Sequence, residues 1–374
     1  MKRPRIAIDA RILSEPLTGI GRYTLEILIR LVENREIDWF LYSHKPIIVG
    51  SWRQPNVYLK TSNLHGRILR MIWAQTVLPY LVKKDAVDLF WSPAHRVPSL
   101  LSNSIFKVVT IHDLVWKYAG DTMRKSSRLL DKWLMPVAIK SADWVFCVSE
   151  STKRDVLDLI PSSHDKLSVT YNAATFLNQP SAEIVNSDIQ RLLGVDYFLF
   201  VGTHEPRKNL DRLLEAISML SLQTKTKMKF YIVGGRGWGG VNVDKLIIQH
   251  NLSGMVEALG YVSEPALYEL YKHAKFLVMP SLYEGFGLPI AEAMNLGVPV
   301  LTSNISSMPE IAGDSAILVD PHSATSIAQG LCSLINDVAL RNDLAKKARK
   351  KSQCYSWDKT AAEIEAIFVA AIKR

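Results

Sequence analysis

Two glutamates, Glu284 and Glu292, stand on either side of a glycine-spaced turn, Gly285–Leu288. Pro289 is expected to begin the helix that follows, because a proline at that position loses no hydrogen bond. The backbone N–H groups of such a turn and the positive end of the helix dipole attract an anion, and the glycines let it approach closely. The two carboxylates would accept hydrogen bonds from hydroxyl groups on either side. The pattern therefore predicts a ligand with phosphate in its middle and sugars at its ends, as in a nucleotide-sugar.

The context of these glutamates is E-G-F-G-L-P-x-x-E-A, and the run G-T-x-E-P-R-K-N-L covers Gly202–Leu210. A bare glutamate pair at this spacing would indicate only two solvated carboxylates on a helix face. Together, however, the two segments resemble the retaining glycosyltransferases of family 4, and the similarity extends from Ile6–Ala10 to the C-terminal tail. The resemblance implies the GT-B fold, in which two Rossmann-like, doubly wound α/β domains face each other across a cleft.

The resemblance also implies roles for individual residues. Arg207 and Lys208 would neutralise the diphosphate, arginine with a planar fork of donors and lysine as a point charge. Glu284 and His112 would contact the donor sugar, and Glu292 would bind the ribose. The other donor-binding residues that it implies are Gly19, Gly21, Gly285, Phe286, Gly287, Leu288, Tyr261 and Val262.

Some of these residues have alternative interpretations. His112 ends the expected strand Val108–His112, where a doubly wound domain binds ligands, although a single histidine is more often structural. Asp113 beside it could orient the ring. The segment Thr18–Tyr23 follows the first expected strand and is expected to open a helix. It suggests a dinucleotide fingerprint, but Thr24 stands where the third glycine is needed. In family terms Thr18–Tyr23 is a glycine loop near the diphosphate or the acceptor, and which glycine makes the contact stays open.

The length of 374 residues suggests two domains of ordinary size. Short apolar strands alternate with helical segments, as in parallel α/β domains. We expect domains at 1–175 and 176–356, and a helix at 357–374 that crosses back to the first domain. The polar stretch from Asn172 to about Gln190 is the expected linker. The expected strands are Ile6–Ala10, Trp39–Ser43, Val57–Thr61, Leu89–Ser92, Val108–His112, Trp144–Ser149, Leu167–Tyr171, Phe198–Gly202, Lys229–Gly234, Glu257–Tyr261, Phe276–Met279, Val298–Thr302 and Ala316–Val319.

The net charge of +9 lies entirely in the first half of the chain. Residues 1–175 carry 25 Lys and Arg against 16 Asp and Glu, whereas residues 176–374 carry 20 of each. The excess predicts an anionic partner, but the basic residues form no nucleic-acid-binding motif. Two segments, 66–84 and 123–134, combine Arg and Lys with Trp and Leu as helices on an anionic membrane do. Ordinary amphipathic helices that cover a sheet are the equally weighted alternative.

Other features place the expected protein in the cytoplasm, peripherally associated with the inner face of the cell membrane. The N-terminus passes directly into a strand-like segment, without a secretory signal, and no run of about 18 apolar residues occurs. The three cysteines, Cys147, Cys332 and Cys354, are widely spaced, which suits a reducing compartment. Cys147 lies in an apolar strand and is expected to be a buried thiol.

No metal site or cofactor is expected from the sequence. It contains no Asp-x-Asp motif and no His and Cys residues at zinc-like spacing. The leaving group would therefore depend on Arg207, Lys208 and helix-terminal N–H groups. A second glycine-rich segment, Gly234–Gly240, is expected to form a tight loop near the nucleotide.

We therefore expect a metal-independent retaining hexosyltransferase of cell-surface polysaccharide biosynthesis. The preferred donor is GDP-mannose, because the sequence looks like those of bacterial O-antigen and capsule mannosyltransferases. The expected acceptor is a saccharide that grows on a lipid carrier. A UDP-sugar donor is the main alternative. A nucleotide-sugar epimerase of similar fold, a non-catalytic relative and a nicotinamide dehydrogenase are less favoured. The sequence leaves the acceptor, the linkage position and the oligomeric state open.

Overall fold

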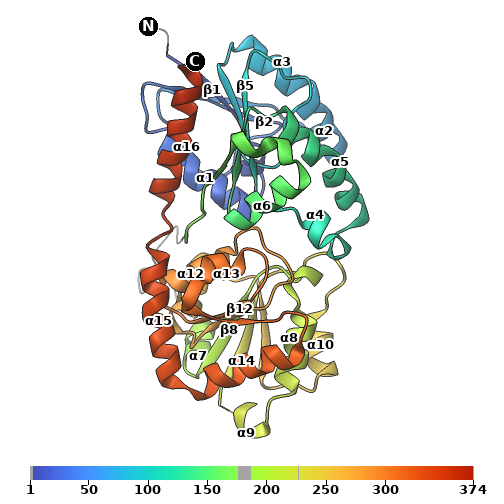
Figure 1. The fold of residues 1–374 in the computed structure, drawn as a ribbon, viewed down its shortest axis with the longest axis vertical. Coiled ribbons are helices and arrows are strands. Elements are labelled where there is room, and N and C mark those ends of the chain that lie inside the picture. Colours follow the sequence, from blue (N-terminus) through green and yellow to red (C-terminus); the bar gives the residue numbers. More distant parts are fainter. Residues whose placement is uncertain (1–2, 176–186, 226, 374) are drawn as a thin grey trace. The chain divides into compact units, whose positions relative to one another are not determined.

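The computed structural model describes residues 3–175, 187–225 and 227–373. Contacts divide the chain into two compact units, each built on one parallel sheet (Figure 1). The first unit consists of Met1–Leu114, Leu129–Asn172 and Ser356–Arg374, and the second consists of Val115–Arg128 and Ala173–Tyr355. These units differ from the predicted domains chiefly in the segment 115–128, which packs with the second unit.

The first unit contains a seven-stranded sheet in the order β3-β2-β1-β4-β5-β6-β7. Its strands are β1 (Arg5–Asp9), β2 (Asp38–Ser43), β3 (Val57–Thr61), β4 (Leu89–Ser92), β5 (Phe106–Ile111), β6 (Trp144–Cys147) and β7 (Leu167–Val169). The second unit contains a six-stranded sheet in the order β10-β9-β8-β11-β12-β13. Its strands are β8 (Tyr197–Val201), β9 (Lys229–Val233), β10 (Val256–Gly260), β11 (Leu277–Met279), β12 (Val300–Ser303) and β13 (Ala316–Val319). Every predicted strand forms, with ends shifted by at most two residues.

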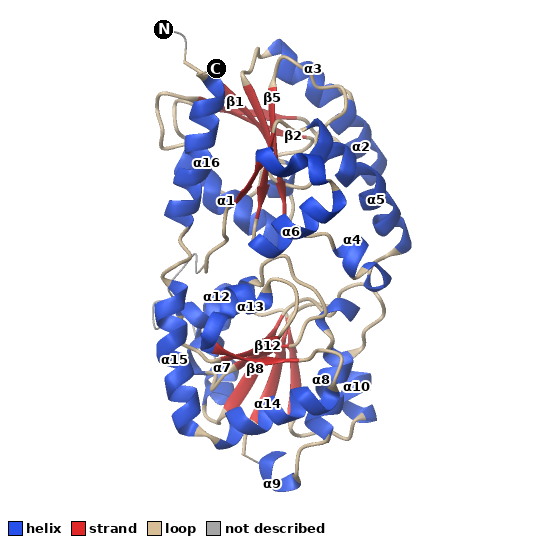
Figure 2. Ribbon diagram, in the orientation of Figure 1, coloured by secondary structure: helices blue, strands red, loops and turns tan. Residues whose placement is uncertain are grey.

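Helices flank both sheets (Figure 2). Those of the first unit are α1 (Gly19–Leu31), α2 (Arg67–Gln75), α3 (Val77–Lys84), α6 (Glu150–Leu159), α16 (Trp357–Ile372) and most of α5 (Lys125–Ser141). Those of the second unit are α4 (Val115–Tyr118), α7 (Ser187–Leu193), α8 (Leu210–Ser218), α9 (Leu222–Lys225), α10 (Val243–Gln249), α11 (Glu264–His273), α12 (Leu288–Asn295), α13 (Met308–Ala312), α14 (Ala324–Asn336) and α15 (Val338–Ser352). Among the described residues, none of these helices is long and apolar enough to cross a bilayer.

The strands are apolar on both faces because helices cover both sides of each parallel sheet. In the second unit, Phe198 of β8 stacks on Phe230 and Phe276, with ring centroids 4.6 and 4.9 Å apart. In the first unit, Phe368 of α16 lies 5.7 Å from the ring of Trp91. The C-terminal helix therefore completes the core of the first unit. Cys147 is buried there, and burial raises the pKa of its thiol, as expected of a structural cysteine.

The segment Thr18–Tyr23 opens a helix, as predicted, with Gly19 and Gly21 in the first turn of α1. Two local predictions need correction. The helix of the glutamate motif begins at Leu288, one residue before Pro289. The expected linker from Asn172 to about Gln190 ends earlier than predicted, since α7 begins at Ser187; residues 176–186 of this stretch lie outside the described residues.

Candidate active site

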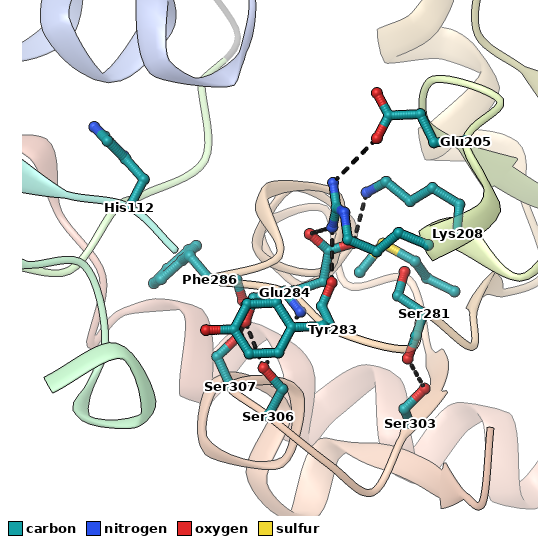
Figure 3. A network of polar contacts seen from close by, with 12 residues as sticks. His112, Glu205, Lys208, Ser281, Tyr283, Glu284, Phe286, Ser303, Ser306 and Ser307 are labelled. Carbon is teal, nitrogen blue, oxygen red and sulfur yellow. Dashed lines mark hydrogen bonds and ion pairs between the residues drawn. The ribbon is translucent and has the colours of Figure 1, made fainter. Parts of the chain in front are cut away.

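The turn between β11 and α12 is held in place by hydroxyl groups. Thr302, Ser303, Ser306 and Ser307 donate hydrogen bonds to main-chain carbonyl oxygens of the segment 279–286, at 2.6 to 3.1 Å. Figure 3 shows the three serines of this set. These hydroxyl groups fix the main chain that carries the first glutamate, which is a positioning role.

Glu284 lies at the centre of a buried ion cluster. Its Oε2 is 2.6 Å from a terminal nitrogen of Arg207, and its Oε1 accepts a hydrogen bond from Nζ of Lys208 at 2.6 Å. All three side chains are largely buried, and Glu205 lies 3.6 Å from the other terminal nitrogen of Arg207. The structure therefore brings together three of the residues that the sequence singled out, across 76 positions of chain.

The two cations keep Glu284 ionised. Burial alone would raise the pKa of this carboxyl, but Arg207 and Lys208 outweigh that effect and lower the pKa to about 2. Burial, opposed by the attraction of Glu284, lowers the pKa of Lys208. A carboxylate in this state is a weak base and a weak nucleophile.

The cations are positioned by main-chain contacts between two loops of the second unit. They lie in a short 3₁₀ turn, Pro206–Lys208, that ends at Asn209 with a left-handed φ of 62°. A terminal nitrogen of Arg207 donates to the Tyr283 carbonyl oxygen at 2.7 Å, and its own carbonyl oxygen accepts from the N–H of Leu282 at 2.9 Å. The loops after β8 and β11 are therefore tied together, and α8 begins at Leu210, directly after the 3₁₀ turn.

A glycine allows the loop after β9 to reach the loop after β8. Gly234 has a φ of 146°, and a Cβ atom there would lie 2.0 Å from the carbonyl oxygen of Gly202. No side chain can be accommodated at that distance. The expected tight loop at Gly234–Gly240 thus packs directly on the loop that carries Arg207 and Lys208.

Glu292 is buried in α12 of the second unit. Its Oε2 accepts a hydrogen bond from the Tyr271 hydroxyl of α11 at 2.8 Å. Tyr271 was not singled out from the sequence, because a tyrosine among the apolar positions of a helix gives no signal of its partner.

His112 lies in the first unit, directly after β5. Its Nε2 is 2.7 Å from the carbonyl oxygen of Pro93, and its ring stacks on that of His95 at 5.3 Å. Burial and the neighbouring His95 lower the pKa of His112 to about 3. The ring is therefore neutral, and Nε2 donates its proton to Pro93, which leaves Nδ1 as an acceptor. The Pro93 carbonyl thus holds the ring, a contact that sequence inspection did not find.

The remaining predicted residues differ in exposure. Gly285, Phe286 and Gly287 are buried in the turn before α12, and Leu288 is half-buried. Gly287 has a φ of 95°, a left-handed conformation that favours glycine at the start of α12. Tyr261 follows β10 with 83% of its surface exposed, and Val262 beside it is half-buried.

One aromatic contact of the motif was not predicted. Tyr283, which precedes Glu284, stacks on Tyr118 of α4 with ring centroids 5.9 Å apart and an angle of 10° between the planes. Tyr118 belongs to the segment 115–128 that packs with the second unit. Among the described residues, no group of three or more His, Cys, Asp or Glu side chains is placed to hold a metal ion.

Sequence comparisons cover both units. Residues 17–174 match the family described as Glycosyltransferase Family 4, and residues 187–351 match Glycosyl transferases group 1. O-antigen chain mannosyltransferase B of Escherichia coli is 30% identical over 360 residues, which cover 92% of this chain and 93% of that protein.

Solved structures resemble the fold over its full length at low sequence identity. Sucrose-phosphate synthase of Thermosynechococcus elongatus superimposes with a TM-score of 0.75 at 19% identity, covering 99% of both chains. HepE of Anabaena in complex with UDP and glucose gives a TM-score of 0.72 at 16% identity, covering 98% of this chain and 100% of that one.

The buried ion cluster predicts an acid-sensitive stability. Because the folded-state pKa of Glu284 is about 2, below its ordinary value of 4.5, its ionised form stabilises the fold. This contribution is complete above about pH 5 and is lost as the pH falls toward 2. We expect Glu284→Gln to lower the free energy of unfolding at neutral pH by about 3 kcal/mol, because it leaves buried cations without their carboxylate.

Urea unfolding at pH 7 and pH 4 measures both effects. The loss in Glu284→Gln should be smaller at pH 4, whereas Glu215→Gln, at an exposed position of α8, should match the wild type at both values. An equal loss at both pH values would contradict the assigned ionisation.

Proposed function

The chain belongs to glycosyltransferase family 4 and has the GT-B fold, and we propose that it is a retaining mannosyltransferase that uses GDP-mannose. The Escherichia coli relative named above is an O-antigen chain mannosyltransferase, similar over more than nine-tenths of both chains. We therefore assign the protein to the biosynthesis of a cell-surface polysaccharide. Its acceptor would be a saccharide, either free or linked to a lipid.

The observation that carries this proposal is the buried cluster of Arg207, Lys208 and Glu284. Two cations fixed side by side match the charge of a diphosphate, and a carboxylate between them suits sugar hydroxyl groups. Donor binding would replace the Glu284 oxygens with phosphate oxygens on the cations and would turn Glu284 toward the hexose. Glu292 would bind the ribose, and His112 would contact the donor sugar.

Front-face displacement is the proposed mechanism. It forms no covalent glycosyl-enzyme, so Glu284 serves only as an acceptor of hydrogen bonds from sugar hydroxyl groups. In the proposed step, the bond from the anomeric carbon to the diphosphate breaks and the acceptor oxygen bonds to the same face. The departing phosphate oxygen takes the acceptor proton. Such a step depends on fixed positive charge at the leaving group, which Arg207 and Lys208 provide.

A UDP-sugar donor is the second candidate. It is favoured by the structural similarity to HepE, whose structure contains UDP and glucose, although 16% identity carries only the fold. The exposed Tyr261 and the half-buried Val262, after β10, are the proposed contacts of the nucleobase. A thermal-shift screen of nucleoside diphosphates separates the donors, since a ligand at 100 times its Kd stabilises by about 2.7 kcal/mol.

We also propose that the first unit binds the inner face of the cell membrane. Ile68 of α2 and Trp133 of α5 expose 73% and 68% of their surfaces. Both helices flank the loop after β4, in which Ser99 contacts Gln75 of α2 and Arg96 pairs with Asp131 of α5. We define the exposed face by exposed side chains of α2, α3 and α5. Its apolar members are Ile68, Leu69, Met71, Ile72, Tyr80, Leu129, Trp133 and Val137, and its lysines are Lys83, Lys84, Lys132 and Lys140.

The cation pair yields a prediction for catalysis. Arg207→Ala removes charge that stabilises the leaving diphosphate, so kcat should fall by about 10²–10³-fold. Transfer of radiolabelled mannose from GDP-mannose to a lipid-linked saccharide extract measures this rate. Arg191→Ala, at an exposed position of α7, is the matched control and should retain full activity. EDTA should have no effect, because Arg207 and Lys208 take the place of a metal ion. Full activity of Arg207→Ala, or loss of activity in EDTA that Mn²⁺ restores, would refute this role.

The exposed face yields a prediction for localisation. Sedimentation should show that the protein binds anionic vesicles, because each basic residue near the membrane surface contributes about 1 kcal/mol of attraction. Added salt should weaken this binding by screening the charges. Trp133→Ser should weaken binding, because tryptophan favours the headgroup region. Leu222→Ser, at an exposed position of α9 in the second unit, should bind like the wild type. Wild-type protein that stays in the supernatant at low salt would exclude the membrane assignment.

A further inference from the structure

Basic side chains gather at one edge of the first sheet. The strands β3, β2, β1 and β4 are parallel neighbours, so their carboxyl ends lie together. The segments that follow them carry Arg70, His44, Lys45, Arg11 and Arg96, in that order of strands. Four of these five side chains are permanent cations, and four separate loops or helices deliver the five to one edge.

Three of the cations already have a carboxylate partner. Asp9 accepts two hydrogen bonds from Arg11, at 2.6 and 2.7 Å. The second and third ion pairs are Lys45 with Glu15 at 2.8 Å and Arg96 with Asp131 at 2.7 Å. Each carboxylate is thus used by a cation other than Arg70.

Arg70 is the cation of this edge whose side chain makes no hydrogen bond or ion pair with any described residue. It is half-buried in α2 and within electrostatic range of Arg11, Arg96, Asp9 and Glu15. Burial and the repulsion from Arg11 and Arg96 lower the pKa of Arg70. A half-buried guanidinium is costly without a partner, and a bidentate oxyanion is the ligand that its planar fork matches.

His44 provides a second, independent sign of a missing ligand. Its side chain is buried, with 3% of the residue exposed, and Nδ1 has no hydrogen-bond partner among the described residues. Its ring lies 6.3 Å from that of Trp73, one turn after Arg70 in α2. A buried polar nitrogen normally finds a partner, so its isolation beside Arg70 indicates a site for an external acceptor.

The outer side of α2 indicates what kind of molecule carries that oxyanion. Ile68, Leu69 and Ile72 expose about half or more of their surfaces on the same helix that supplies Arg70. A cation next to exposed apolar side chains suits an amphiphile, with a phosphate group attached to a hydrocarbon chain.

We propose that Arg70 and His44 form an oxyanion subsite that holds the phosphate or diphosphate of an amphiphilic acceptor, whose hydrocarbon chain contacts the exposed side of α2. This inference rests on the proposed function, because it gives the acceptor of that reaction a chemical class. It assigns the acceptor to the class of lipid-linked phosphates. The residues proposed to bind the acceptor phosphate are different from Arg207 and Lys208, which are proposed to bind the donor diphosphate.

The subsite also makes a prediction for His44 itself. Burial together with Arg70, Arg11 and Lys45, only partly opposed by Glu15, lowers the pKa of His44 to about 4. A bound oxyanion offsets those positive charges and raises this pKa, so His44 takes up a proton as the anion binds. Binding should therefore strengthen as the pH falls through the bound-state pKa.

The direct test follows the His44 ring by NMR in the full-length protein, with His44→Gln used to assign its signal. Inorganic pyrophosphate at pH 7 is the probe for measuring affinity. Sulfate is the anion for the pH titration, because its own charge does not change over the pH range in which His44 titrates. We expect sulfate to raise the pKa of His44 and Arg70→Gln to weaken pyrophosphate binding about tenfold to hundredfold. Arg154→Gln, at an exposed position of α6, removes the same charge from the same unit and should change nothing.

Further arms separate the possible outcomes. Arg70→Lys keeps a charge and should bind more tightly than Arg70→Gln, which guards against a folding defect. Arg207→Ala should leave the response of the His44 signal unchanged. An error in the assignment of the donor site can therefore be distinguished from an error in the assignment of the Arg70–His44 subsite. If the His44 signal changes with phosphatidylglycerol vesicles but not with pyrophosphate, the site binds the headgroup of a bulk lipid, and the acceptor assignment is wrong. If the His44 signal changes with neither pyrophosphate nor the vesicles, or if Arg70→Gln still responds to pyrophosphate like the wild type, the proposed oxyanion subsite is wrong.

Discussion

The buried contact of Glu284 with Arg207 and Lys208 is the interaction on which the second unit depends. Two cations and one carboxylate are withdrawn from water together, and such a cluster is tolerable only when each charge has a partner. The hydroxyl groups after β12, the main-chain contacts of Arg207 and the close approach at Gly234 all serve to fix its geometry. The loops of this sheet therefore bring a neighbouring pair of cations together with a carboxylate that lies 76 positions away in sequence.

This cluster links structure to reaction. In the free protein, Glu284 occupies the cations that a diphosphate would use, so the site is assembled before the donor arrives. Preorganised charge of this kind stabilises a leaving group without reorganisation during the reaction. The low pKa of Glu284 keeps its carboxylate ionised in the free protein, so that it can accept hydrogen bonds. The first unit contributes a different chemistry, with its basic sheet edge and exposed apolar helices.

Much of the fold could be predicted from the sequence because it is written in local patterns. Apolar runs marked the strands, and the segment around Glu284 marked both the turn and the helix after it. The exact start of a helix was less certain, as Leu288 shows, because a proline such as Pro289 fits more than one position of a first helical turn. Contacts between distant residues were not predictable. Tyr271 on Glu292 and Pro93 on His112 join positions whose proximity only the sheet order determines.

The same distinction applies to charge. The excess of basic residues in the first half was visible in composition, and it suggested a membrane. Composition does not show that Lys45, Arg11 and Arg96 have carboxylate partners whereas the Arg70 side chain has none among the described residues, since pairing depends on which loops meet at the sheet edge. The family motif likewise identified Arg207, Lys208 and Glu284 but not their mutual neutralisation in the free protein.

The most direct test of the central claim is calorimetric titration of the protein with GDP and GMP, and in parallel with UDP and UMP. If Arg207 and Lys208 hold a diphosphate, one nucleoside diphosphate should bind at least about tenfold more tightly than its monophosphate, the factor for one charge-assisted contact. Lys208→Met should remove most of that difference while leaving monophosphate binding nearly unchanged. Equal affinity for the diphosphate and the monophosphate, or a difference that persists in Lys208→Met, would contradict the account.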